Sequence, residues 1–477
     1  MFKLSPLGLL LLVFALPLTS LAQEHSPCPT SLSTSNNPPQ IARTGDLLCL
    51  VPQVYGPSGL VGQNFGGPLN STTGHSVHFQ AAAVNSFGPI NSEIGVQLSQ
   101  LPLASPASGF IFSFNPSLGV VTRSAESFGP ILTDRAETIG RKKLFLGVSY
   151  QFFNFDQADG VNLRNFGAVL THEPEPTVCA TAPLTPGCST TGAPTYTHDI
   201  VATQNNVSLK VHQVTIVATY GITDRLDISL AVPLLEVRMD MYSDANIFNF
   251  EPPPTNHAFA PPSVPSKFEN FISPTQALFF NGNSARGIGD LVVRGKFLAW
   301  KGEHSAVAVG VDARLPTGDA NNFLGAGTWG VRPFATYTYS GRISPHASVG
   351  FQGNGDSVLA GNVTTQPTTV AHLPDIFTYS AGVDAGVVRR LSVSFDFLGQ
   401  SLRDAAKIAS STYTDYVGNS HSDITTSVGT VNQASIAGGF KANVVRNLLF
   451  TANVLYQVNH AGLHSKPVPL AGLSYTF

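Results

Sequence analysis

The sequence contains no long apolar run after its first 22 residues, and this excludes helical membrane spans. A helix needs about 20 consecutive apolar residues to cross the hydrocarbon core. Charged residues are also scarce, at 12% of 477, which is about half the share of a soluble domain. A chain with so little charge and no apolar helix can satisfy its backbone in lipid only as a closed β-barrel.

Several functional motifs are also missing. No CxxC, HExxH or GxSxG occurs, and the net charge of −3 comes without a long basic run. We therefore expect no zinc site, no cofactor, no nucleic-acid partner and no enzymatic activity. A Ser–His pair assembled from distant strands remains the alternative, because His212 and His346 fall in expected strands with Ser208 and Ser344 nearby.

The N-terminus has the pattern of a cleaved secretion signal. Lys3 supplies the positive charge, Leu7 to Leu16 form a short apolar core, and Ser20-Leu21-Ala22 fits the signal peptidase pattern. We expect cleavage after Ala22. His25-Ser26-Pro27 is no lipobox, so Cys28 is not expected to carry a lipid.

The four cysteines are few, even in number and clustered, which suits an oxidising compartment. Four cysteines allow three connectivities. We expect the two local disulfides, Cys28 with Cys49 and Cys179 with Cys188.

Alternation of apolar and polar residues marks the expected strands. Leu391, Val393 and Phe395 share one face, for example, and Ser392 and Asp396 share the other. From residue 143 we count about twelve such segments, at 143–156, 207–221, 226–240, 285–300, 304–316, 327–340, 342–354, 375–389, 391–403, 431–445, 447–459 and 466–477. In the third segment the phase of the apolar residues changes after Pro233, and we attribute this change to a β-bulge.

The links between these segments alternate in length. Short links lie at Thr223–Arg225, Lys301–Glu303, Ser340–Arg342, Arg389–Arg390 and Val445–Asn447, and longer ones at 157–206, 241–284, 317–326, 355–374 and 404–430. Outer-membrane barrels have this asymmetry, with short periplasmic turns and long outer loops. The sequence therefore predicts an all-β fold, a transmembrane antiparallel barrel of about 12 strands. Both termini of the barrel are expected to be periplasmic.

The C-terminus supports the same architecture. Phe477 ends the chain, and Tyr475, Leu473 and Ala471 precede it at alternate positions. This arrangement resembles the signal that the barrel-assembly machinery recognises. We expect that machinery and outer-membrane lipid as partners of the chain.

Residues 23–142 lack the strand pattern, so we divide the chain into a signal peptide (1–22), an irregular segment (23–142) and the barrel (143–477). Phe110, Phe112 and Phe114 alternate before a turn, and this hairpin would either raise the strand number to 14 or belong to a plug. A barrel of this width leaves a lumen that its own side chains fill poorly. We therefore expect part of the segment either to plug the lumen or to form an extended arm.

Charged residues on the expected strands should face the lumen, because Arg or Lys on the lipid face costs about 2–4 kcal/mol at the midplane. These pore-lining candidates are Asp227, Asp290, Arg294, Lys296, Asp312 and Arg314. One interpretation is a charge ladder that stiffens the wall, which we favour. The alternative is a polar constriction that selects solutes.

Two short patterns carry a family resemblance. Gly287-Ile288-Gly289-Asp290-Leu291, followed by Arg314-Leu315-Pro316-Thr317-Gly318-Asp319 and Phe323-Leu324-Gly325-Ala326-Gly327, resembles outer-membrane proteins linked to the meta pathway of phenol degradation. The segment from Tyr220 to Asp227 is similar to a short turn of the same family. The resemblance implies a transporter, loosely related to fatty-acid and aromatic-hydrocarbon channels that carry an N-terminal plug. We therefore expect a passive channel for small hydrophobic or aromatic solutes. The alternative is a barrel with a structural or adhesive role.

Overall fold

The computed structural model describes most of the expected barrel and parts of the segment before it. The described residues are 28, 45–56, 59–60, 63–64, 79–103, 112–115, 120–123, 127–172, 198–250, 257–259, 269–363 and 369–477. The expected signal peptide and the cysteines Cys179 and Cys188 lie outside this set.

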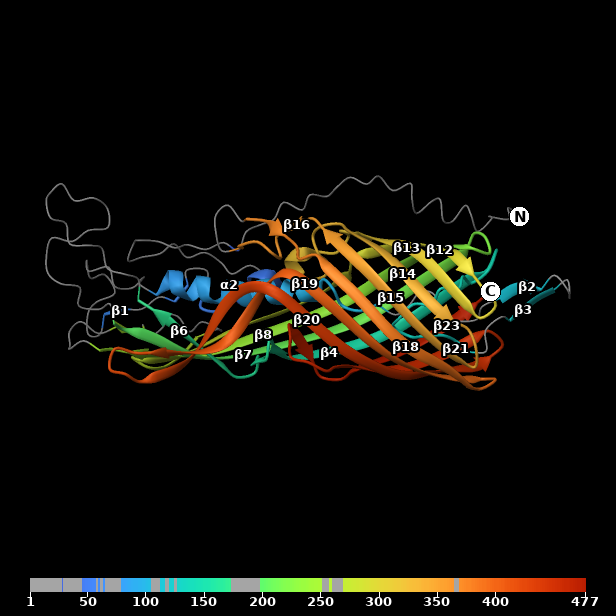
Figure 1. Ribbon diagram of the computed structural model, residues 1–477. Helices are drawn as coiled ribbons and strands as arrows, with labels where there is room; N and C mark the ends of the chain where they lie inside the picture. The colour runs from blue at the N-terminus through green and yellow to red at the C-terminus, as the bar shows by residue number, and fades with distance from the viewer. Residues whose placement is uncertain are drawn as a thin grey trace, which may run out of the picture.

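A closed antiparallel barrel of 12 strands forms the body of the molecule, as the alternation predicts (Figure 1). It closes where β4 pairs with β23 on one side and with β7 on the other. Within the described residues, no helix is long and apolar enough to cross a membrane. The strands are β4 (Leu144–Ala158), β7 (Ile200–Gly221), β8 (Leu226–Phe248), β11 (Gln276–Ile288) continued by β12 (Leu291–Lys301), β13 (Ser305–Leu315), β14 (Gly330–Tyr339), β15 (Ile343–Asn354), β18 (Ile376–Val388), β19 (Leu391–Thr414), β20 (Ser420–Val445), β21 (Leu448–Gln457) and β23 (Val468–Thr476).

Shorter elements decorate this barrel. They are η1 (Leu47–Cys49), β1 (Gln63–Asn64), α2 (Gln80–Leu98), β2 (Phe112–Asn115), β3 (Val120–Arg123), β5 (Val161–Asn162), β6 (Phe166–Thr171), β9 (His257–Ala258), β10 (Glu269–Ser273), η2 (Ala320–Asn322), β16 (Asp356–Ser357), β17 (Ala371–His372) and β22 (Leu463–Ser465). The hairpin expected near Phe110 exists as β2 and β3, but it pairs only with itself and projects beyond the barrel at the right of Figure 1. The 14-strand alternative is therefore wrong.

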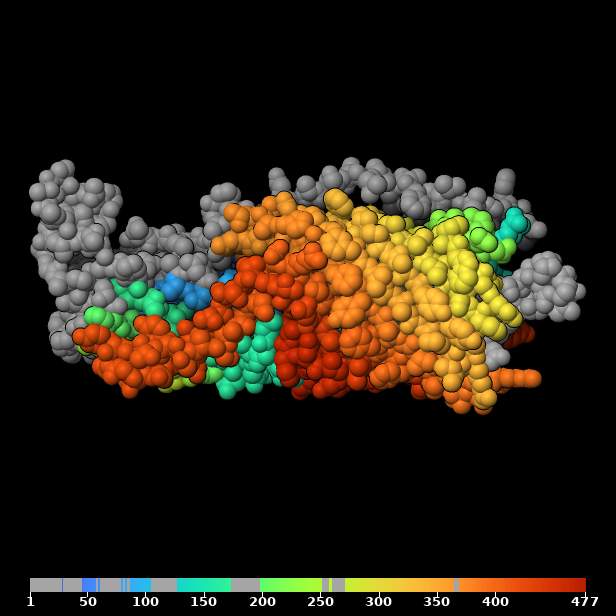
Figure 2. Space-filling model, in the orientation of Figure 1, coloured from blue at the N-terminus to red at the C-terminus, as the bar shows by residue number. Residues whose placement is uncertain are grey.

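Four strands are much longer than a membrane requires. β7, β8, β19 and β20 have 22, 23, 24 and 26 residues, whereas a transmembrane strand needs about 9–11. The surplus extends past the barrel at the end opposite the short turns, and the tip of the β19–β20 hairpin is visible at the left of Figure 2. The wall thus has a membrane-spanning part and a long extension beyond it.

The expected bulge does not lie in β8 at Pro233; the one-residue register shift is on the opposite strand, between Ile288 opposite Leu234 and Val292 opposite Ala231. β7 and β8 pair without a register shift from Ile200 opposite Phe248 to Gly221 opposite Asp227. Successive side chains of β8 still point alternately outward and inward, but along the strand the apolar residues change from the outward face to the inward face. Leu234 faces outward and is 38% exposed, whereas Val237, a few residues on, faces inward and is fully buried. Apolar residues therefore face lipid in the spanning part and face the interior in the extension.

The N-terminal segment fills the interior of the extension. Ala83, Phe87, Ile90 and Ile94 form one buried face of α2, at helical spacing. This face belongs to the same apolar cluster as the inward residues of β7, β8 and β19, and the Cys28–Cys49 disulfide lies in that cluster.

Gln100 to Leu103 descend from α2, and residues 127–140, which we call the inner strap, run inside the barrel before β4 begins. The strap is largely buried, including Phe128, Ile131 and Ile139. Its contacts reach strands all around the barrel, so it is held in the interior at the short-turn end.

Candidate functional site

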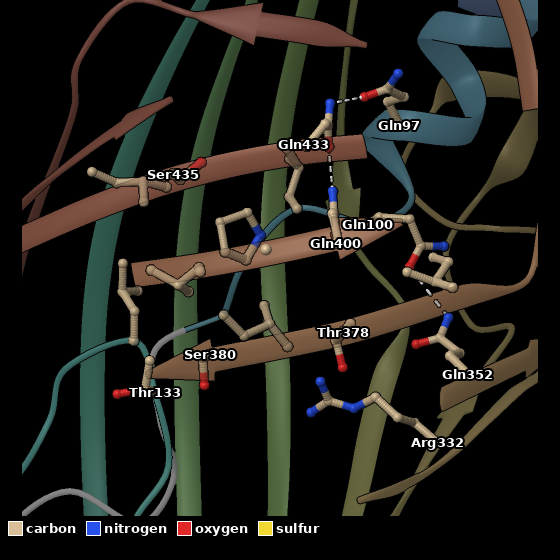
Figure 3. Close-up of a pocket in the computed structure, with 18 of the residues that line it drawn as sticks. Gln97, Gln100, Thr133, Arg332, Gln352, Thr378, Ser380, Gln400, Gln433 and Ser435 are labelled. Carbon is tan, nitrogen blue, oxygen red and sulfur yellow. Dashed lines mark hydrogen bonds between the residues drawn. The ribbon is translucent and has the colours of Figure 1, made fainter. Parts of the chain in front are cut away.

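A cavity of about 350 Å³ lies inside the barrel between the end of α2 and the inner strap (Figure 3). Gln100 to Leu103 bound it on one side, and Leu132 to Asp134 of the strap on another. The rest of its lining comes from strands on every side of the barrel. Residues that precede the barrel thus contribute to the lining of the cavity on two sides.

Glutamine side chains form the polar wall nearest α2. Gln433 of β20 donates to Gln97 at the end of the helix and accepts from Gln400 of β19. Gln352 of β15 donates to Gln100 at 3.2 Å. Figure 3 shows these amides turned toward one another across the cavity edge. Each amide both donates and accepts, so this wall suits uncharged groups that form hydrogen bonds.

An apolar wall stands across the cavity. Phe153 and Phe155 of β4, Leu455 of β21 and Val468 of β23 line it. Leu132 of the strap adds to the same surface. Because polar and apolar side chains both line it, the cavity suits a small amphipathic molecule rather than a fully hydrated ion.

The charged wall is a ladder across three neighbouring strands. Arg294, Asp312 and Arg332 stand opposite one another in register on β12, β13 and β14. Arg294 donates two hydrogen bonds to Asp312, at 2.6 and 2.8 Å. Arg332 donates to the same carboxylate from Nε at 3.0 Å. Its side chain is 26% exposed, more than that of any other group in the ladder, so Arg332 is the cation that a solute in the cavity would meet.

The strap is tied to this ladder and to its neighbours. Asp134 accepts from Arg294 Nη1 at 2.7 Å. The Lys296 ammonium donates to the carbonyls of Arg135 and Glu137, at 3.0 and 2.7 Å.

Further strap contacts reach other strands of the wall. Asp227 accepts from the backbone N–H of Ile139 at 3.0 Å. The Thr338 hydroxyl accepts from the N–H of Ala136 at 2.9 Å. Most expected lumen charges thus contact the N-terminal segment or one another.

Asp290 has a different partner. It accepts hydrogen bonds from the backbone N–H groups of Gly318 and Ala326, at 3.0 and 2.7 Å, and so clasps the β13–β14 loop. A Cβ at Gly325 would collide with its carboxylate. The residues that carry the family resemblance therefore form a structural clasp.

Arg314 lies beside this clasp and reaches the N-terminal segment. Its Nε is 3.6 Å from Asp290. It donates to the carbonyl of Ser99 at 3.3 Å and to Asn354 at 2.8 Å. The end of α2 is thereby linked to β13 and β15.

A second polar network fixes the other half of the strap. His346 Nε2 lies 2.8 Å from both Asp396 and Thr133. Ser127 donates to Asp384, and Lys441 donates to the carbonyls of Phe128 and Pro130. His346 is 3% exposed, so it holds the strap to the wall and does not face the cavity.

His212 does not line the cavity either. It lies on the outer face of β7 and contacts the Tyr150 hydroxyl at 2.8 Å. Neither histidine forms the Ser–His pair that the sequence left open. The described residues contain no group of three His, Cys, Asp or Glu side chains that could hold a metal.

Helix α2 carries one buried acid. Burial raises the pKa of Glu93 well above its ordinary value of 4.5, and repulsion from Asp159 adds to the effect. Neither carboxyl oxygen has a hydrogen-bond partner within the described residues. The neutral acid is therefore the form that fits the docked helix.

Sequence reasoning missed Arg332, Asp134 and the glutamines. Arg332 lies in a correctly expected strand, two residues after Gly330 and opposite Asp312, so the strand pattern alone would have placed it inside. Asp134 belongs to a segment without periodicity, and its position depends on contacts 160 residues away.

A closed antiparallel barrel of 12 strands defines a transmembrane β-barrel protein. The family model described as "Putative MetA-pathway of phenol degradation" matches residues 189–461. This is more than half of the chain, which therefore belongs to that family. No curated protein matches the sequence.

Three solved structures are among those to which the chain is similar. An outer-membrane channel from Pseudomonas putida F1 is 12% identical over 72% of this chain and 98% of its own, with a TM-score of 0.40. A FadL homologue from Pseudomonas aeruginosa is 11% identical over 78% and 96%, with a TM-score of 0.31. The monoaromatic hydrocarbon channel CymD is 9% identical over 70% and 88%, with a TM-score of 0.24.

Proposed function

We propose that the protein is an outer-membrane channel that admits small amphipathic or aromatic solutes through the barrel. The observation that carries the proposal is the internal cavity, which Gln97 to Leu103 and Leu132 to Asp134 line together with the barrel strands. The barrel itself leaves a path, and residues before β4 occupy it. A barrel with a purely structural role has no need of such an arrangement.

The cavity lining indicates the class of solute. Its volume of about 350 Å³ is at the lower end of the range for small-molecule sites, about 300–1,000 Å³. The apolar wall at Phe153 and Phe155 fits a ring or short chain. Arg332 and the glutamines fit a hydroxyl or carboxylate on that ring. The family description, which refers to phenol degradation, agrees with this class.

The proposal includes the division of the chain. Residues 1–22 would direct export and be removed, residues 23–142 would form the plug and residues 143–477 the barrel. Arg294, Asp312 and Arg332 would line the path, and the short turns would face the periplasm. The terminal Tyr475 and Phe477 would serve as the signal for barrel assembly.

The experiment uses a strap that can be locked. Ala136 and Thr338 contact each other through a hydrogen bond of 2.9 Å, so the pair Ala136→Cys and Thr338→Cys offers a cross-link between strap and wall. We expect porin-deficient cells that express the native protein to take up 4-nitrophenyl solutes faster than vector-only cells. Oxidation of the double variant should abolish the difference and reduction should restore it.

The controls are each single cysteine variant and the native protein under the same redox conditions. They separate the engineered cross-link from effects on native cysteines. Equal uptake by native, locked and vector-only cells would contradict the channel and favour the structural or adhesive role.

A further inference from the structure

The short-turn end of the barrel carries a ring of exposed cations that the proposed transport function does not use. We call this ring the basic rim. It comprises Arg141, Lys142, Arg225, Lys301, Arg342, Arg389, Arg390 and Arg446, all exposed. Every one of the short turns contributes at least one cation, so the ring surrounds the whole rim.

Little negative charge offsets this ring. The exposed carboxylates on the same turns are Asp224 and Glu303. None of the eight cations forms an ion pair with a described carboxylate, unlike Arg238 and Arg286 at the other end. The chain as a whole has a net charge of −3, so the rim is a local concentration of positive charge.

An exposed apolar side chain accompanies the cations on each turn. Trp300 precedes Lys301 and is 54% exposed, and Ile343 follows Arg342 and is 62% exposed. Val388 and Val445 repeat the pairing before Arg389 and Arg446, at 59% and 55%. In each pair the apolar residue lies on the lipid-facing surface of a strand, and the cation lies where that strand meets the turn.

This repeated pairing fits a ligand with an acyl chain and an anionic head. We propose that the basic rim binds anionic phospholipids of the leaflet at the short-turn end, with their phosphates on the cations and their chains against the neighbouring apolar residues. Basic residues next to a membrane surface attract anionic lipid in this way. An acidic soluble protein would not need the lipid-facing partners, and it would favour one side of the rim.

The two tryptophans of the chain allow a direct test. Trp300 lies in the rim, and Trp329 lies at the long-loop end of the barrel, 57% exposed. Trp329→Phe leaves Trp300 as the single reporter in reconstituted vesicles. Brominated phosphatidylglycerol should quench the fluorescence of Trp300 more strongly than brominated phosphatidylcholine at the same mole fraction. The apparent binding of the two lipids derived from this quenching should differ by roughly twofold or more. High salt should reduce this preference.

A triple variant removes the cations nearest the reporter. Arg225 lies beside β12, since its carbonyl accepts a hydrogen bond from the N–H of Leu298 at 2.8 Å. Arg342 lies on the neighbouring turn, where the N–H of Ser340 donates to the carbonyl of His304 on the turn that contains Lys301. Changing Arg225, Lys301 and Arg342 to Gln should bring the two lipids to equal quenching. Heat-modifiable gel mobility would show that the variant barrel is folded.

The matched control is Trp300→Phe, which keeps Trp329 as the reporter. Any phosphatidylglycerol preference of Trp329 should be the same with and without the three rim cations. Equal quenching of Trp300 by the two lipids in the unsubstituted rim would overturn the proposal. So would a preference that survives the triple change and high salt. The test does not involve transport, so its outcome is independent of the proposed channel function.

Discussion

Asp134 is the strap's carboxylate on the charged ladder, and Asp134→Ala should loosen the strap without unfolding the barrel. The change removes a hydrogen bond of 2.7 Å to the buried Arg294 guanidinium. A hydrogen bond to a charged group contributes about 1.5–3 kcal/mol. Loss of a sole buried partner would cost more, but Arg294 keeps both bonds to Asp312. We therefore take about 2 kcal/mol as the cost, which is about thirtyfold in the undocked population.

Amide hydrogen exchange measures this population. Peptides from residues 127–140 should exchange about thirtyfold faster in Asp134→Ala, provided that exchange follows local opening, while peptides from β15 and β18 keep their protection. Single-channel conductance in planar bilayers should rise in parallel. Glu303→Gln is the matched control, because Glu303 is an exposed carboxylate on a turn. Unchanged strap exchange in Asp134→Ala, with the barrel intact, would refute the assignment of Asp134 as a latch.

Four further predictions follow from other contacts. Because the pKa of Glu93 is raised in the folded state, docked α2 should be most stable below pH 4.5 and lose stability as the pH rises toward the raised pKa. Glu93→Gln should remove this pH dependence, measured by amide hydrogen exchange of residues 80–98 corrected for intrinsic exchange rates. Asp290→Ala should free the β13–β14 loop at a cost of about 2–4 kcal/mol, seen as new proteolytic cleavage within 317–327. Arg332→Gln should weaken binding of 4-hydroxybenzoate about tenfold while leaving toluene unaffected, by equilibrium dialysis. A peptide tag inserted after Gly418 should be detected on intact cells, and one inserted after Gly302 only after permeabilisation; the reverse pattern would invert the orientation.

The strands were predictable because their signal is local. Alternation such as that of Leu391, Val393 and Phe395 reports two faces with different surroundings, and this holds whatever the rest of the chain does. The short turns were equally visible, since they interrupt the alternation at regular intervals. The strand number and the closure of the barrel follow from these two local facts.

The phase change at Pro233 shows where this reasoning fails. Sequence alternation reports a contrast between faces but not which face is inside. Beyond the membrane the outside becomes water and the inside becomes the apolar cluster around α2, so Val237 and Met239 face inward in unbroken register. A bulge and an exchange of environments give the same pattern. Only the position of the N-terminal segment distinguishes them, and that segment has no periodicity to reveal its place.

The lumen charges have a similar dependence on distant partners. Their inward orientation followed from the cost of charge in lipid, and a ladder that bridges strands was the favoured interpretation. The pairing of Arg294 with Asp312 and of Asp312 with Arg332 is known only from the register of the structure. Their partners on the strap and on the β13–β14 loop could not be derived, because hydrogen-bond partners far apart in sequence leave no local trace. In the closed state these charges are engaged by Asp134, by backbone groups and by one another. In the proposed channel, departure of the strap would leave Arg294 and Lys296 to exchange strap oxygens for water or solute, whereas Asp290 would keep its bonds to the β13–β14 loop. The same wall would then act as a clasp where its partner is a loop and as a releasable latch where its partner is the strap.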